Sequence, residues 1–310
     1  MKREWIDVTR FEAWNVPYKI AKHHIYMYWT HPKLFPCDEM GFRIPTGFSS
    51  FKEKYRKSKD MQLRNIFCLG SSTTFGLFCS YDDCYVHHLE NYLPNSAVFN
   101  FGLCGLDHTG ATYILLDLLR LDYIPDIVIF LDGINEKQGW IQASEGNKNY
   151  EEMSWQYRCF RELIFNNNIP MSLKWEKKEN IMKRLRKKIV ENVHDPNKLK
   201  NQSPLRFIEQ QSESYVKSCR AIQKIAAAWN INANFLLEPT VWDVWDGHHD
   251  LLYNYLKALY KNIIGKCENV IDISKKTSLG PAHFIEWKHI NKEGHRILAE
   301  DIAREIFMKA

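Results

Sequence analysis

Three short, almost wholly apolar segments alternate with helical segments between residues 65 and 131, and this alternation limits the fold more than any other feature. The apolar runs are NIFCL (65–69), AVFNFG (97–102) and DIVIFL (126–131). Residues 81–93 and 109–121, which separate them, repeat their apolar positions with helical spacing. Strands that are apolar on both faces are typical of parallel sheets covered by helices on either side. We therefore expect an α/β domain with a central parallel sheet between two layers of helices.

The alternation resumes towards the C-terminus after an interruption. There the sequence predicts a helix over 205–229, strands over 233–239 and 269–274, and an amphipathic closing helix over 292–308. Residues 1–60 have weak periodicity and many aromatic residues, and we expect them to wrap the domain formed by 61–310. Residues from about 140 to 204 break the pattern, which predicts a helical insertion.

The centre of this insertion is strongly basic. Residues 174–190 (KWEKKENIMKRLRKKIV) contain eight Lys or Arg and two Glu, and Ile181, Leu185 and Ile189 recur four residues apart. This spacing predicts an amphipathic helix. One interpretation is that its apolar stripe rests on the body of the protein while its charges face solvent. The alternatives are a lid over the active site, or a surface that contacts anionic lipid or polymer.

Composition excludes several classes of protein. The net charge of +5 is too mild to indicate nucleic-acid binding. No run of about 18 apolar residues occurs, and the N-terminal MKREWIDVTRFEAW lacks the apolar core of a signal peptide. The eight cysteines form no CxxC pair and no metal-ligand pattern. We expect a cytoplasmic protein without cofactor, bound metal or stable membrane insertion; the oligomeric state is not predicted.

Small and polar residues follow each of the first three predicted strands. Ser72 comes just after Gly70, Gly105 follows the second strand, and Asn135 follows the third. In an open parallel sheet these three loops lie on one rim, where ligands bind. The rim therefore offers a serine nucleophile, a glycine N–H that a ligand can approach, and an amide donor.

A serine nucleophile needs a base, and His289 stands just before the last predicted helix. Glu286 lies three residues earlier, from where a carboxylate can orient the imidazole through its second nitrogen. Taken singly, Ser72 fits a helix N-cap, Asn135 a turn residue, and His289 a cap or a core histidine.

Four segments in this order resemble the SGNH/GDSL hydrolases. GSSTTFG resembles the first motif of that family, FNFGLCG the second, DGINE the third, and EWKHINKEGH the last. The resemblance implies a flavodoxin-like SGNH fold. It implies that Ser72, His289 and Glu286 are the nucleophile, base and acid. It also implies an oxyanion hole formed by Ser72, Gly105 and Asn135.

The sequence departs from the family pattern at three positions. Ser71 replaces the aspartate of the first motif, which in the family supports the loop, and Glu136 and Glu286 each replace an aspartate. The segments Met40–Arg43 (MGFR) and LLEPT (236–240) also resemble SGNH proteins encoded with bacterial surface-polysaccharide genes. If Glu286 points away, His289 acts with a backbone carbonyl as a dyad.

The resemblance implies a serine esterase that acts on a small acyl ester, such as an O-acetyl group on a carbohydrate. The alternatives are O-acyl transfer to a glycan or metabolite, and a catalytically silent carbohydrate-binding or scaffold protein. Trp242 and Trp287 lie near the predicted rim, where they could stack on a sugar, or they pack in the core. The residues Asp243, Asp246, His248, His249 and Asp250 have a metal-site composition but no ligand spacing, so we interpret them as a solvated loop.

Overall fold

A computed structural model describes residues 35–38, 40–136, 208–244, 253–267, 269–285 and 288–308, and the backbone alone of 19–20, 27–28, 204–207 and 251–252. The main sheet consists of β3 (Arg64–Gly70), β4 (Ser96–Gly102), β5 (Ile127–Asp132), β6 (Asn232–Leu237) and β7 (Val270–Asp272). The helices are α1 (Phe51–Asp60), α2 (Ser72–Phe75), α3 (Tyr85–Tyr92), α4 (His108–Arg120), α8 (Pro204–Ala228), α9 (Val241–Val244), α10 (Leu251–Lys266) and α11 (Lys292–Phe307). Two short strands, β1 (Lys19–Ile20) and β2 (Met27–Tyr28), form a separate antiparallel pair.

All five strands of the main sheet run parallel, in the order β4-β3-β5-β6-β7. Counted along the chain this order is 2-1-3-4-5, which is the order of flavodoxin-like folds. The expected α/β class and its central parallel sheet are confirmed.

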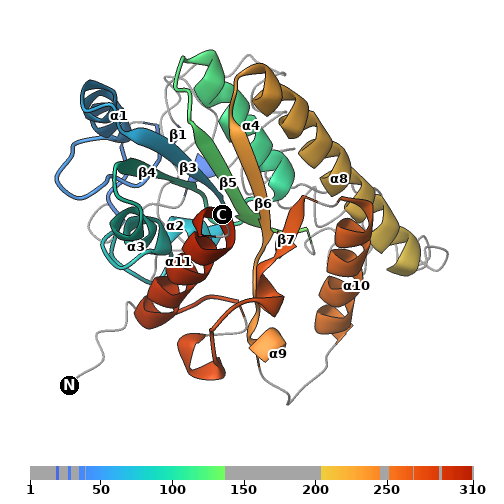
Figure 1. Cartoon of the computed structure of the whole chain (residues 1–310). Helices are drawn as coiled ribbons and strands as arrows, with labels where there is room; N and C mark the ends of the chain where they lie inside the picture. Colours follow the sequence, from blue (N-terminus) through green and yellow to red (C-terminus); the bar gives the residue numbers. More distant parts are fainter. Residues whose placement is uncertain are drawn as a thin grey trace, which may run out of the picture.

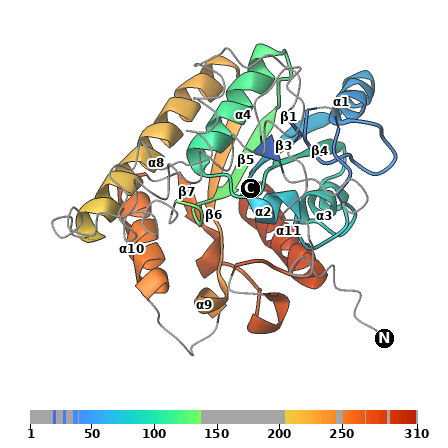
Figure 2. The ribbon, with the colours of Figure 1, turned by 180° about the vertical axis from the view of Figure 1, so that it is seen from behind.

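Helices cover both faces of the sheet, as Figures 1 and 2 show from opposite sides. One face packs against α1, α4, α8 and α10 through an apolar cluster that includes Phe67, Phe99, Phe130 and Phe235. The other face, with Ile66, Val98, Ile129 and Leu236, packs against α3 and α11. Successive strand residues point to opposite faces, so two buried faces require strands that are apolar throughout. This is the reason the strand segments could be recognised in the sequence.

Helices α1 and α10 were not predicted from the sequence. Together with α4 and α8 they cover one face of the sheet. Helix α1 buries Phe51 and Tyr55 against the sheet, so part of the segment expected to wrap the domain contributes to its core. Helix α10 buries Tyr255, Leu256, Leu259, Tyr260 and Ile263. They recur three and four residues apart, which is the spacing of one helical face, so the signal was present in the sequence.

The strand predicted over 269–274 is shorter than expected. β7 ends at Asp272, and Ile273–Lys275 form a 3₁₀ helix. The Asp272 carboxylate accepts a hydrogen bond from the Ser274 N–H at 3.2 Å, which satisfies a donor at the start of this turn. The strand thus ends at Asp272 because this residue caps the 3₁₀ helix that follows.

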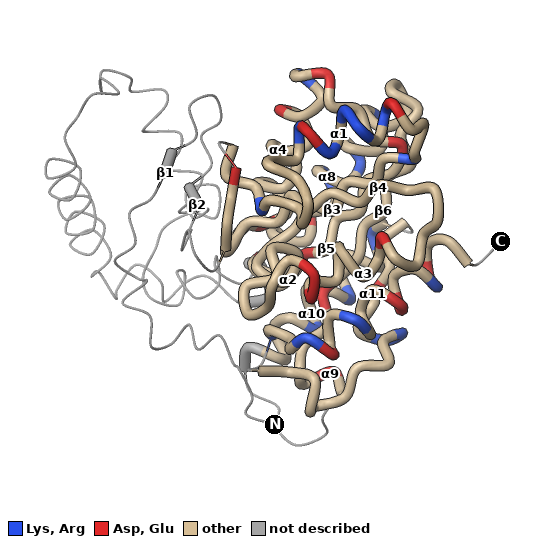
Figure 3. The backbone as a smooth tube through the Cα atoms, turned by 90° about the vertical axis from the view of Figure 1, so that its left-hand side faces the viewer, with Lys and Arg blue, Asp and Glu red and all other residues tan. Residues whose placement is uncertain are grey.

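Charged residues lie mostly on the helices and loops around the strands, as Figure 3 shows for the described part of the chain. Within that part, no helix is both long and apolar enough to cross a bilayer. The predicted insertion from about 140 to 204, with its basic segment 174–190, lies outside the described residues.

A neutral histidine lies between α3 and α11. His295 is fully buried, stacks on Tyr85, and accepts the Tyr85 N–H at its Nδ1. Burial disfavours its imidazolium form and lowers its pKa to about 3, and the nearby Arg43 guanidinium acts in the same direction.

Acid should therefore weaken this contact. Below pH 6.5 the unfolded chain binds a proton that folded His295 excludes, so stability falls as the pH falls from 6.5 towards about 3. The variant His295→Asn keeps an acceptor near the Nδ1 position but has no imidazole to protonate. Between pH 6.5 and 4.5 we expect its free energy of unfolding to fall by about 2–3 kcal/mol less than that of the parent. Urea unfolding at pH 6.5, 5.5 and 4.5 measures this difference. Parallel stability curves for the two proteins would contradict it.

Candidate active site

The strand register brings the ends of β4, β3, β5 and β6 level. Gly70 at the end of β3 pairs with Gly102 of β4 and with Leu131 of β5, and Asp132 pairs with Leu237 of β6. The loops that follow therefore start at one edge of the sheet, next to the point where the strand order reverses. Ligands bind at such a point in open α/β sheets.

Ser72 and His289 meet at this edge. The Ser72 Oγ lies 2.7 Å from His289 Nε2, although 217 residues separate them in the sequence. Both residues are buried, with 3% and 8% of their surfaces exposed. The Phe78 ring lies against the imidazole, with ring centroids 4.9 Å apart. A serine hydroxyl and an imidazole nitrogen at this distance can exchange a proton, which is the first requirement of a serine nucleophile.

Backbone hydrogen bonds hold His289 in place from both sides. Its carbonyl accepts the Ile285 N–H at 2.8 Å, and the Asn291 N–H donates to the His283 carbonyl at 2.8 Å. Asn291 then caps α11 by accepting the Gly294 N–H. The loop that carries His289 is thus closed on itself before α11 begins.

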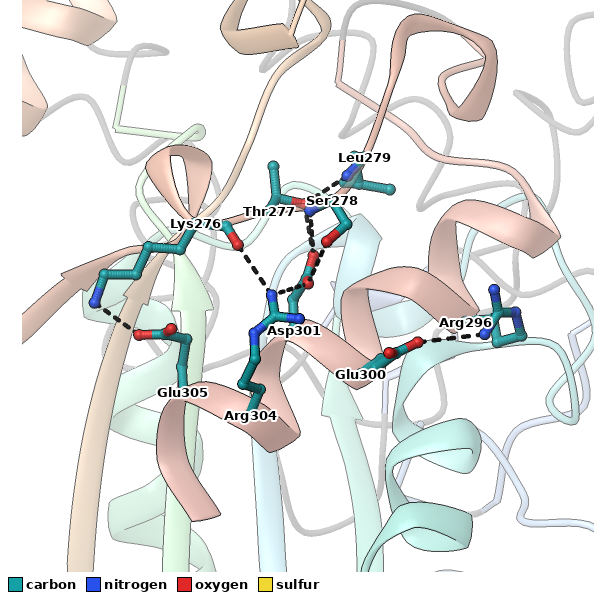
Figure 4. Close-up of polar contacts among 9 residues, drawn as sticks. All are labelled: Lys276, Thr277, Ser278, Leu279, Arg296, Glu300, Asp301, Arg304 and Glu305. Carbon is teal, nitrogen blue, oxygen red and sulfur yellow. Dashed lines mark hydrogen bonds and ion pairs between the residues drawn. The ribbon is translucent and has the colours of Figure 1, made fainter. Parts of the chain in front are cut away.

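The chain leading into this loop is anchored to α11. Figure 4 shows Asp301 of α11 facing the loop residues Thr277 and Ser278. The buried Asp301 carboxylate accepts the Thr277 hydroxyl and the Ser278 N–H, each at 2.8 Å, and contacts Arg304. A buried carboxylate with several donors fixes the loop it contacts.

Close packing and a buried cation both hold the C-terminal end of α2, the helix that begins at Ser72. A Cβ on Gly102 would lie 2.3 Å from the Phe75 N, so only glycine allows β4 to approach the helix this closely. The buried Arg43 guanidinium donates to the carbonyls of Phe75, Gly76 and Cys79 at 2.9–3.2 Å. In the sequence Arg43 is marked only by the MGFR resemblance, and its contact with the end of the helix that carries Ser72 is seen only in the structure.

Hydrogen bonds join the second loop to the first and the third loop to the second. The Leu103 N–H donates to the Gly70 carbonyl at 3.0 Å, and Asn135 Nδ2 donates to the Leu106 carbonyl at 2.8 Å. Gly105, between them, adopts a left-handed φ of +78° that favours glycine. An amide nitrogen carries two hydrogens, so Asn135 keeps a second donor beside the one bound to Leu106.

A buried polar network that the sequence analysis missed supports the Asn135 loop. The His108 ring binds Asp132 through Nδ1 at 2.7 Å, and the Tyr215 hydroxyl donates to the other oxygen of Asp132 at 2.6 Å. Burial alone would lower the pKa of His108, but the Asp132 carboxylate outweighs it and raises that pKa. The Cys219 thiol lies 3.5 Å from His108 Nε2. The sequence gives no sign of this role for His108, because the residues that its ring contacts lie far from it in the chain.

Glu136, which follows Asn135, is part of the same network. Its Oε1 accepts the His108 N–H at 2.7 Å. Burial, together with the charges of Asp132 and Asp107, raises the pKa of Glu136 and so favours its protonated form. Its Oε2 is buried, and among the described residues it has no hydrogen-bond partner.

The remaining predicted residues divide into two groups. Glu286 and Trp287 lie outside the described residues, so their roles stay predictions. Trp242 is partly buried, packs against the core and lies 6.1 Å from the Tyr253 ring. Of the acidic and histidine cluster only Asp243 is described: it accepts hydrogen bonds from the Thr240 N–H and hydroxyl and pairs with Lys257.

No protein-family model matches this chain, and no curated protein matches it. Among solved structures, one similar protein is a member of the lipolytic G-D-S-L family from Veillonella parvula DSM 2008. It is 15% identical, with a TM-score of 0.45 over 80% of this chain and 100% of that one. An acetyl xylan esterase is 12% identical, with a TM-score of 0.44 over 78% and 100%. The M. smegmatis aryl esterase is 11% identical, with a TM-score of 0.40 over 80% and 100%. In structure the chain is similar to GDSL-type lipolytic proteins and esterases.

Proposed function

We propose that the protein is an SGNH/GDSL-type serine esterase that hydrolyses a small acyl ester, such as an O-acetyl group on a carbohydrate, through an acyl-enzyme on Ser72. The observation on which this rests is the 2.7 Å contact between Ser72 Oγ and His289 Nε2 at the carboxyl edge of the sheet.

In the first half of the reaction, Ser72 Oγ attacks the ester carbonyl while His289 Nε2 takes the hydroxyl proton. The carbonyl oxygen becomes an oxyanion, for which the proposed donors are the N–H groups of Ser72 and Gly105 and the Asn135 amide. The tetrahedral intermediate then collapses. The alcohol leaves with the proton from His289, and the acyl group stays on Ser72.

In the second half, water attacks the acyl-enzyme and gives its proton to His289. The carboxylic acid is released, and Ser72 recovers its hydroxyl. We propose Glu286 as the group that orients the imidazole through Nδ1, as the acid of a triad. If a sugar hydroxyl replaces the water, the same steps transfer the acyl group, so the acceptor separates an esterase from an O-acyltransferase.

A fluorophosphonate probe tests the nucleophile. We expect a single covalent adduct on Ser72, located by peptide mass spectrometry, and none on Ser72→Ala. Ser80→Ala is the matched control, because the Ser80 hydroxyl is exposed and binds Asp83 outside the site; it should be labelled as the parent is. An unlabelled folded protein that also fails to hydrolyse acetyl esters would overturn the proposed function.

A further inference from the structure

The residue before the proposed nucleophile binds a carboxylate from a distant strand. The Ser71 hydroxyl donates to Glu238 Oε1 at 2.8 Å, across 167 residues of sequence. Both residues are buried, with 2% and 1% of their surfaces exposed. In the resembled family an aspartate occupies position 71, and this chain has instead a serine there and a carboxylate that reaches it from the end of β6.

The Ser71 side chain does not take the role that its position suggests. Ser71 is the N-cap of α2, with extended backbone angles, yet its side chain makes no capping hydrogen bond. The N-caps of the longer helices α4 and α11 behave differently, since Asp107 and Asn291 each accept an N–H from the first turn. The Ser71 hydroxyl is instead committed to Glu238.

Glu238 is itself held firmly. Its N–H donates to the Asp132 carbonyl at 2.9 Å, which continues the pairing of β5 with β6. Its carbonyl accepts the Tyr260 hydroxyl at 3.0 Å. Because β5 lies between β3 and β6, the Ser71–Glu238 bond spans β5 and fixes the first loop to a rigid part of the sheet.

We propose that Glu238 is a positioning residue for Ser72, which acts through Ser71. By fixing residue 71 it sets the start of α2, and so directs the Ser72 hydroxyl at His289. This inference rests on the proposed function. A carboxylate that follows β6 would support the first loop from outside, in place of the aspartate that the family carries within it.

Loss of this bond should lower the rate more than the binding of substrate. A nucleophile displaced by about 1 Å can lose about 10²-fold in rate. For Glu238→Ala and for Ser71→Ala we expect kcat to fall about 10–100-fold with KM within about three-fold. The double variant should be no slower than the slower single one, because both changes remove the same bond.

Glu238→Gln keeps an acceptor oxygen for Ser71 and should retain at least about a third of kcat, as the conservative rescue. Glu213→Ala is the matched control for loss of a glutamate. It lies exposed on α8, and we expect parental kcat and KM.

Moving the carboxylate gives the sharpest test. Ser71→Asp alone places two carboxyl groups together in a buried site. We expect this variant to be inactive at pH 8. Its kcat, as a fraction of the parental kcat at the same pH, should rise at lower pH, where the two carboxyl groups can share a proton. The exchange variant Ser71→Asp with Glu238→Ser restores one carboxylate and one hydroxyl, and we expect it to regain at least about ten-fold of the lost kcat. A role in packing alone predicts neither the pH-dependent recovery nor the rescue.

The outcomes separate the two proposals. If the parent forms no fluorophosphonate adduct, the proposed function fails and the positioning role fails with it. The other outcome is that the parent, Ser71→Ala and Glu238→Ala are all labelled and hydrolyse the ester at the same rate. In that case the positioning role is overturned and the proposed function stands. Urea unfolding checks that each variant is folded; should Glu238→Ala not fold, Ser71→Ala, Glu238→Gln and the exchange variant decide the question.

Discussion

Ser72→Ala, His289→Ala and the double variant are all expected to fall to the same residual rate, about 10⁴-fold or more below the parental kcat. The reason is the 2.7 Å contact between Ser72 Oγ and His289 Nε2: the hydroxyl without its base and the base without the hydroxyl are equally ineffective. Steady-state hydrolysis of an acetyl ester by the four proteins measures this cycle.

His87→Ala serves as the matched control for the histidine. His87 is partly exposed on α3 and its ring contacts Tyr81 and His88, so we expect parental turnover. Additive effects of the two single changes would show that Ser72 and His289 do not act as one unit. A fully active His289→Ala would exclude His289 as the base.

Asn135→Ala is expected to lower kcat about 10²–10³-fold with little change in KM, which corresponds to about 2.7–4 kcal/mol of transition-state stabilisation. One Asn135 hydrogen is bound to the Leu106 carbonyl, which orients the amide. The second is the proposed donor to the oxyanion, and this charge exists only in the transition state and intermediate. The measurement is the separation of kcat from KM on an acetyl ester.

Two comparisons keep this result interpretable. Asn234→Ala, on the less buried part of β6, removes an amide that binds only Asn232 in the described part of the chain, and should leave turnover unchanged. Fluorophosphonate labelling of Asn135→Ala should slow as well, because attack on phosphorus also develops negative charge on oxygen. An increase in KM with an unchanged kcat would instead place Asn135 in substrate binding.

The strands and the helices α3, α4, α8 and α11 could be predicted because local pattern decides them. β3, β4 and β5 are buried on both faces, so nearly every residue in them is apolar, and little else produces such runs. Helix α10 was not predicted, although its buried residues have helical spacing. The β7 segment was predicted too long because Asp272 ends the strand through a contact with Ser274.

The sequence predicted the location of some residues of the candidate site but not of those that support them. Ser72, Gly105 and Asn135 follow strands, and parallel strands place such loops on one edge, so their neighbourhood followed from sequence order. The supporting residues did not. Arg43, His108 and Glu238 bind carbonyls, carboxylates or hydroxyls that lie between 24 and 167 residues away, and no local pattern marks such partners.

The amino-acid sequence by itself determined the α/β class, the parallel sheet, and the serine, glycine, asparagine and histidine that are candidates for the chemistry. Only the tertiary structure decided that Ser72 and His289 meet at 2.7 Å, and that the carboxylate beside Ser71 comes from β6. The physical reason is one of range. Strand and helix patterns repeat every two to four residues and can be recognised within one segment, whereas a hydrogen bond needs atoms within about 3 Å, which depends on how separate segments pack.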